Sequence, residues 1–255
     1  MTCLGAKLGI RDPRNLRLSN YLTEPLLDAP PLLIDWDKPS EGAYQMWAND
    51  QVGDCVFAAF YNMLAGASKE TGKPFEATNP LVLADYACVT GYDPKTGAND
   101  NGTNPEDALR YYTQKPLGDQ GRIVAWGEVD RHQITEVRQA LQIFGGVYTA
   151  LALPKSAQAQ VGDIWSVPLL PSPDRIPGSW GGHMTITRHI DATKHPMSLW
   201  TVTWGNPQQM TEAFWKKYCS AAYFFITEQW VADNGETPSG FDLDQLLADV
   251  KELQS

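Results

Sequence analysis

The sequence predicts a mixed α+β protein in which helical segments come first and strands follow. In the first half, apolar residues surround whole segments or recur at helical spacing, and turn residues bound these segments. The second half contains short runs rich in β-branched and aromatic residues, which are typical of strands. Because helices and strands are segregated along the chain, the pattern favours an α+β fold over alternating parallel βαβ units.

Three helices are expected in the first half. Residues 55–65 are apolar around nearly the full circumference, which for a helix means burial, and Cys55 follows polar turn residues at its N-terminus. A second helix begins at Pro105 and carries acidic residues in its first turn. A third covers residues 134–144 and ends at Gly145.

The second half is expected to supply most of the strands. These are predicted at residues 147–153, 184–190, 199–204 and 222–226. A short helix at 211–218 separates the last two, and an amphipathic helix at 241–253 carries leucines on one face.

Composition and charge exclude several classes of protein. With 255 residues, 43% hydrophobic residues and nine tryptophans, the chain is long and apolar enough to build its own core. A net charge of −10 argues against nucleic acid or an anionic membrane as the main partner. The chain has no spanning apolar run and no secretory signal, so the expected location is the cytoplasm.

The two ends of the chain differ in charge from the middle. Residues 1–29 form a basic arm, residues 30–230 the main domain and residues 231–255 an acidic tail. The arm has too little apolar area to fold alone, so we expect it to order only against another surface. Opposite charge on the ends predicts a homo-oligomer or a larger protein assembly formed through residues 1–20 and 241–253.

Cys55 is the main chemical signal in the sequence. At a helix N-terminus the dipole favours thiolate, which predicts a lowered pKa, whereas the neighbouring Asp54 opposes it. His183 follows a Gly-Gly pair at the start of a predicted strand, and a cysteine ahead of a distant histidine is the order found in thiol hydrolases. The alternative for Cys55 is a small packed side chain, the interpretation given to Cys88 and Cys219.

No metal or cofactor is expected. The acidic and amide residues between Asp93 and Asn101 lack the spacing of a calcium loop. His132, His189 and His195 lack metal-ligand spacing. His189 lies six residues after the histidine at position 183, so strand alternation predicts that both face the same side.

Several motifs occur in an order that is characteristic of one family. They are Ile34-Asp-Trp36, Asn49-Asp-Gln-Val-Gly-Asp-Cys55, the stretch from Gly91 to Leu109, Gly145-Gly-Val-Tyr-Thr-Ala-Leu151, Gly181-Gly-His-Met-Thr-Ile186 and Val202-Thr-Trp-Gly205. This series resembles the papain-like cysteine peptidases over roughly residues 33–226. The resemblance implies the papain-like two-lobe fold, with a helical lobe at about residues 50–144 and an antiparallel β lobe at about residues 145–230.

The resemblance also implies roles for individual residues. Cys55 would be the nucleophile and His183 its general base. Gln51, which lies two residues closer to the cysteine than in papain, would donate to the oxyanion beside the Cys55 N–H. Trp204 would cover the histidine side of the site.

The residue that orients the histidine is not evident from the motif. The family places an asparagine two residues before the tryptophan, where this chain has Val202. Asn206 is the nearest alternative in the sequence.

Two functions remain open from the sequence. The first is a papain-like thiol hydrolase that acts on peptide or amide bonds of a peptide or protein substrate. The second is a non-catalytic papain-fold structural or interaction protein, such as a capsid or tail accessory component of a phage virion. Residues 1–29 are shorter than the large propeptides of papain-like zymogens, so we do not expect them to inhibit the site.

Overall fold

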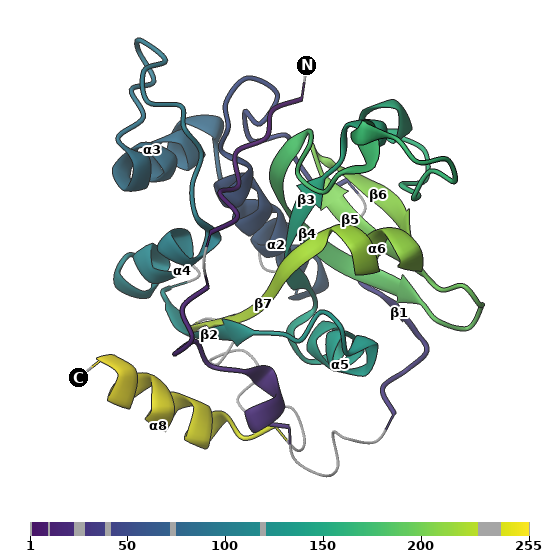
Figure 1. Cartoon of the computed structure of the whole chain (residues 1–255). Helices are drawn as coiled ribbons and strands as arrows, with labels where there is room; N and C mark the ends of the chain where they lie inside the picture. The colour runs from purple at the N-terminus through teal and green to yellow at the C-terminus, as the bar shows by residue number, and fades with distance from the viewer. Residues whose placement is uncertain are drawn as a thin grey trace.

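Figure 1 shows the computed structural model, which describes residues 2–9, 11–22, 29–38, 42–71, 75–117, 121–228 and 241–254. At the centre of this described part lies a seven-stranded antiparallel sheet. Its order is β2-β7-β3-β4-β5-β6, and β1 pairs with β4. The strands are β1 (Leu33–Asp35), β2 (Ile123–Glu128), β3 (Val147–Leu153), β4 (Gly181–Asp191), β5 (Ser198–Thr203), β6 (Asn206–Thr211) and β7 (Cys219–Thr227).

Helices pack on both faces of this sheet. The α-helices are α2 (Cys55–Thr71), α3 (Asn79–Thr90), α4 (Pro105–Gln114), α5 (Ile134–Phe144), α6 (Glu212–Tyr218) and α8 (Leu243–Gln254). The 3₁₀ helices are η1 (Leu18–Asn20), η3 (Lys155–Gln160) and η4 (Pro173–Arg175). The predicted α+β class is therefore confirmed, and helices α2, α4 and α5 begin where the sequence predicts.

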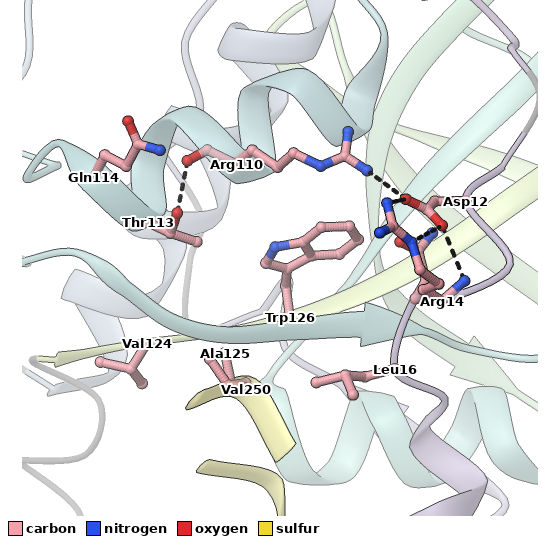
Figure 2. A pocket seen from close by; sticks show the side chains of 11 residues that line it. Asp12, Arg14, Leu16, Arg110, Thr113, Gln114, Val124, Ala125, Trp126 and Val250 are labelled. Atoms are coloured by element: carbon pink, nitrogen blue, oxygen red, sulfur yellow. Dashed lines mark hydrogen bonds and ion pairs between the residues drawn. The ribbon is translucent and has the colours of Figure 1, made fainter. Parts of the chain in front are cut away.

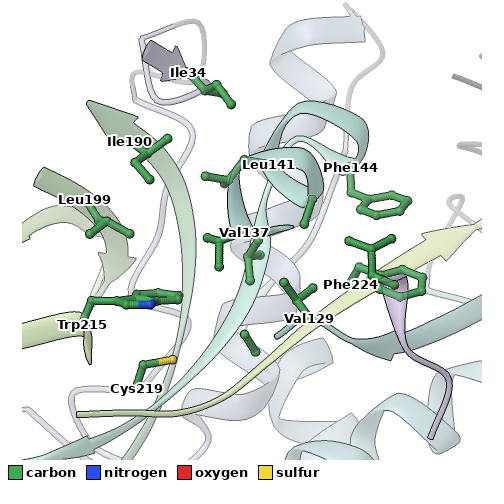
Figure 3. Packing of buried hydrophobic residues seen from close by; sticks show 14 of the residues in the cluster. Ile34, Val129, Val137, Leu141, Phe144, Ile190, Leu199, Trp215, Cys219 and Phe224 are labelled. Carbon is green, nitrogen blue, oxygen red and sulfur yellow. The ribbon is translucent and has the colours of Figure 1, made fainter. Parts of the chain in front are cut away.

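The core consists of two hydrophobic clusters. One joins α2, α3 and α4 to the sheet through residues such as Tyr148 and Ile186. The other lies between the sheet and α5, α6 and α8, and Figure 3 shows part of it, with Leu141 and Trp215 among its members. Since α2 is apolar all round, it needs cover on every side, and the sheet and the two neighbouring helices supply it.

Several elements were not predicted. Helix α3 has apolar residues spread around its circumference, so no helical stripe marks it, and it ends where Gly91 takes a left-handed conformation. Strands β1, β2 and β6 are short, and their extended shape depends on partners far away in the sequence. Strand β2 lies in the range expected to hold the helical lobe, yet it pairs with β7.

The arm orders against its own chain. Leu18 and Tyr21 are buried in the cluster that also contains Leu246 of α8. The Tyr21 hydroxyl donates to the Asp249 carboxylate at 2.7 Å, and Leu22 forms an isolated antiparallel bridge with Phe241. The surface that orders the arm is therefore the body and tail of the same molecule (Figure 1). Assembly between copies stays a prediction.

A cavity of about 280 Å³ lies where the arm, α4, β2 and α8 meet (Figure 2). Asp12 accepts from Arg14 at 2.8 Å and lies 3.6 Å from Arg110 on one wall. Trp126 and Val250 contribute apolar surface to the same cavity. The ion pair between Asp12 and Arg110 joins the arm to α4, and Val250 of the tail helix lines the opposite part of the same cavity.

No helix in the described parts of the chain combines the length and apolar character needed to cross a bilayer.

We predict that Leu18→Ala lowers the free energy of unfolding by about 2–5 kcal/mol, because a fully buried leucine leaves a cavity when truncated. Urea denaturation of the full chain measures the change. Leu32→Ala is the matched control, since Leu32 is 52% exposed and its truncation should change stability by less than about 1 kcal/mol. Equal effects of the two substitutions would contradict docking of the arm.

Candidate active site

Cys55 is the first residue of α2 and directly follows a polar turn, and only 1% of the residue is exposed. The Gly53 N–H donates to the Asp100 carboxylate at 3.0 Å. The Asn49 side-chain amide donates to the Asp54 carboxylate at 3.1 Å. The Asp54 carbonyl accepts from two N–H groups of the first helical turn, so the helix begins at the predicted cysteine.

His183 lies near the start of β4 and is also 1% exposed. Its ring stacks on Trp204, with centroids 4.5 Å apart and planes inclined by 20°. A hydrogen bond of 2.5 Å joins its Nε2 to Thr203 Oγ1 at the end of β5. Among the described residues Nδ1, the other ring nitrogen, has no hydrogen-bond partner.

One contact brings the cysteine and the histidine strand together. The Met184 N–H donates to Cys55 Sγ at 3.4 Å, and Met184 directly follows His183. The Tyr148 hydroxyl donates to the Val56 carbonyl at 2.6 Å and so ties the start of α2 to β3. The sulfur therefore lies one residue along β4 from the imidazole.

A segment of the arm crosses this site, and we call residues 3–9 the strap. Its parallel bridge to the loop before α4 joins Ala6 to Thr103. Four backbone hydrogen bonds hold it: Cys3 N–H to Asn49 O at 3.0 Å, Ala6 N–H to Gly182 O at 3.0 Å, Thr103 N–H to Gly5 O at 2.7 Å and Lys7 N–H to Thr103 O at 2.8 Å. In addition, the Trp204 indole donates to the Cys3 carbonyl at 3.3 Å.

The strap packs so closely against the turn before α2 and the start of β4 that the glycines at these contacts leave no room for a side chain. A Cβ atom on Gly5 would overlap the Gly53 carbonyl oxygen, and one on Gly182 would overlap the Ala6 carbonyl oxygen. The backbone of Gly5 and Ala6 slightly offsets the raised pKa of the Cys55 thiol. The strap therefore lies over Cys55, a position that the expectation of no inhibition by residues 1–29 did not foresee.

Burial dominates the electrostatics of the site. It raises the pKa of Cys55 to about 12, with a further increase from the Asp54 charge and a partial offset from the Met184 N–H. It lowers the pKa of His183 to about 3. The lowered cysteine pKa expected from the helix dipole is therefore wrong for the covered state, which holds a neutral thiol and a neutral imidazole.

Asp54 is a second group whose charge is disfavoured. Burial raises its pKa to about 8, and its Oδ2 has no hydrogen-bond partner among the described residues. Its ionised form is thus destabilised next to the thiol.

The other cysteines differ from each other. Cys219 is buried beside Trp215 (Figure 3), and burial raises its pKa to about 12. Cys88, which was expected to be packed, is exposed on α3, because its side of the helix lies outside the core.

The remaining sequence candidates take separate positions. Trp204 stacks on the histidine ring as the resemblance implies. Gln51 lies in the turn before α2 with an exposed side chain. Asn206 donates to the Trp204 carbonyl at 3.1 Å and does not bond the imidazole. Sequence reasoning missed Thr203, whose only signal is its place beside the tryptophan in the motif.

His189 faces away from His183, contrary to the alternation argument. A β-bulge between Thr187 and His189 adds one residue to β4 relative to β5 and reverses the faces beyond it. His189 therefore stacks on Trp200, 4.0 Å between centroids, and lies 3.6 Å from Asp35. In the described ranges no group of three or more His, Cys, Asp or Glu side chains is arranged to hold a metal ion.

Comparison with known proteins finds no matching family model and no matching curated protein. Solved structures do match. Xylellain, a cysteine protease from Xylella fastidiosa, aligns with a TM-score of 0.65 and 13% identity over 89% of this chain and 96% of its own. The fold is papain-like.

Two further solved structures share this papain-like fold. Digestive procathepsin L 3 of Tenebrio molitor larval midgut gives a TM-score of 0.58 and 10% identity over 88% of this chain and 75% of its own. The proform of the ragweed pollen allergen Amb a 11, a cysteine protease, gives a TM-score of 0.55 and 15% identity over 77% of this chain and 66% of its own. These likenesses confirm the predicted papain-like architecture.

We predict that Asp54→Asn stabilises the protein increasingly as the pH rises from about 4 to about 8. The folded state binds the Asp54 proton more tightly than the unfolded state, because burial raises the pKa of Asp54 to about 8. The parent therefore loses stability as the pH rises through this range, whereas the amide introduced by Asp54→Asn does not titrate. Thermal melts at pH 4, 6 and 8 should show equal Tm values at pH 4 and a gap of several degrees at pH 8. The same Tm difference between variant and parent at all three pH values would contradict the raised pKa of Asp54.

Proposed function

We propose that this protein is a thiol hydrolase that acts on peptide or amide bonds and is held in a latent state by its strap. The observation that carries the proposal is the contact of Cys55 Sγ with the Met184 N–H, one residue from His183. The imidazole is held by a hydrogen bond and by a stacked indole, which is the support that a general base needs. The cysteine protease neighbours support the same reaction class.

The proposed reaction follows from the positions of these groups. His183 takes the thiol proton as the Cys55 sulfur attacks the substrate carbonyl, and then gives that proton to the leaving amine. The Cys55 N–H, at the first position of α2, has no intrahelical acceptor and is available for the oxyanion. Gln51 lies in the adjoining turn, and we assign it the second donor.

The backbone of the strap is engaged with the body on both sides of the site. The Ala6 N–H donates to the Gly182 carbonyl, and the Gly5 carbonyl accepts from the Thr103 N–H. A thiolate attacks a carbonyl carbon, and with the Gly5 carbonyl bonded to the loop before α4 we infer that the strap blocks the site without being cut. Latency also accounts for the neutral thiol, since removal of the strap returns water to Cys55 and removes the main cause of its raised pKa.

The second candidate is a non-catalytic interaction protein. The complete burial of Cys55 and His183 favours it, because a permanent strap would leave the cleft silent. The two candidates differ in whether uncovering the cysteine yields hydrolysis.

The test is to displace the strap by adding one methyl group to it. Gly5→Ala places a Cβ on the Gly53 carbonyl oxygen, so the strap must leave its seat. We predict that iodoacetamide labels Cys55 at least about 10-fold faster in this variant, and that it hydrolyses a quenched fluorescent peptide library while the parent does not. Mass spectrometry and fluorescence provide the two measurements.

Gly9→Ala is the matched control, because a Cβ there meets only the Asn104 side-chain amide, at 3.2 Å, and no backbone atom. It should label and hydrolyse as the parent does. Cys55→Ala in the Gly5→Ala background should abolish hydrolysis. Fast labelling of Cys55 without hydrolysis would reject the hydrolase and leave the interaction protein.

A further inference from the structure

A series of buried threonines runs across β3, β4 and β5 and ends at the candidate base. Thr201 Oγ1 donates to Thr185 Oγ1 at 2.6 Å, and Thr149 and Thr187 share a hydrogen bond of 2.9 Å. These hydroxyls satisfy one another inside the sheet. Thr203, at the end of β5, bonds instead to His183 Nε2 at 2.5 Å.

Other residues near the imidazole do not fill this role. Val202 has no polar atom in its side chain and packs in the cluster around α2. The Asn206 amide donates to the Trp204 carbonyl. The hydroxyl of Thr203 is thus the side-chain group that bonds the ring in the described part of the chain.

The direction of this hydrogen bond decides which ring nitrogen can act as a base. A neutral imidazole carries one N–H, and a threonine hydroxyl both donates and accepts. If Nε2 carries the proton, it donates to Thr203 and Nδ1 keeps its lone pair. If Nδ1 carried the proton, it would have no capacity to accept the thiol proton, and it would be a buried donor without a partner among the described residues. Unprotonated Nδ1 is likewise without a partner among them, so the Thr203 bond is the contact that can favour one tautomer.

Stacking fixes the remaining freedom of the ring. Trp204 has φ of 48°, a left-handed conformation that is uncommon outside glycine, and this backbone turn places its indole over His183. With one face against Trp204 and one edge on Thr203, the imidazole is held at two points.

We propose that Thr203 is the positioning residue of the site, and that its hydroxyl accepts from Nε2–H of His183 and so keeps Nδ1 as the proton acceptor. This inference rests on the proposed function for its consequence in catalysis. The tautomer itself is a property of the covered protein and is measurable without activity.

The first experiment is ¹⁵N NMR of the full chain labelled at its four histidines, with the His183 signals assigned by their loss in His183→Asn. The expected result is a protonated Nε2 and an unprotonated Nδ1 in the parent and in Thr203→Ser. In Thr203→Val the ring loses its acceptor, and the shifts should move toward a mixture of tautomers.

Thr201→Val is the matched control: the same change in the same strand, at a buried residue that bonds Thr185 and not the histidine. It should lower the melting temperature without changing the His183 shifts. Unchanged His183 shifts in Thr203→Val, or an Nδ1-protonated ring in the parent, would overturn the proposal.

The second experiment measures kinetics in the Gly5→Ala background. Thr203→Val should lower kcat by about 10²-fold with little change in KM, and Thr203→Ser should restore most of it. Equal kcat in Thr203→Val and Thr201→Val, per folded molecule, would overturn the positioning role. If no variant hydrolyses peptides, the proposed function fails while the NMR result still decides the tautomer.

Discussion

The burial of α2 is the constraint on which the rest of the structure depends. A helix that is apolar around its whole circumference is stable only when other elements cover all of it, and here the sheet covers one side and α3 and α4 the other. The Tyr148 hydroxyl bonds the Val56 carbonyl and so sets the depth of the helix against β3. The first residue of α2, Cys55, is thereby brought to the start of β4.

The same burial determines the chemistry of the covered state. Cys55 and His183 are almost fully buried, so both groups favour their neutral forms and the helix dipole is not enough to create a thiolate. The Met184 N–H donates to the sulfur, yet the loss of solvent on burial outweighs it.

The arm and the tail are parts of one docking arrangement. Leu18 and Tyr21 anchor the arm in a cluster shared with α8, and the strap crosses from the turn before α2 to the start of β4. The strap is held by backbone hydrogen bonds and by two apolar side chains: Ala6 lies in the cluster around α2 and Leu4 packs against the other cluster.

The sequence by itself determined the α+β class, the start of the central helix at Cys55, the strand that begins near His183 and the tryptophan beside it. These features depend on local signals: hydrophobic spacing, turn residues and a motif order that resembles one family. It did not reveal α3, β1, β2 and β6, because their signals are weak or lie in distant partners, and it placed His189 on the wrong face because a β-bulge has no local mark. The tertiary structure alone decided the strap over the cleft, the bond between Thr203 and His183 and the direction of the pKa shifts. Each of these features depends on which distant segments meet and on how much solvent they exclude. Neighbouring residues in the sequence carry no signal for either property.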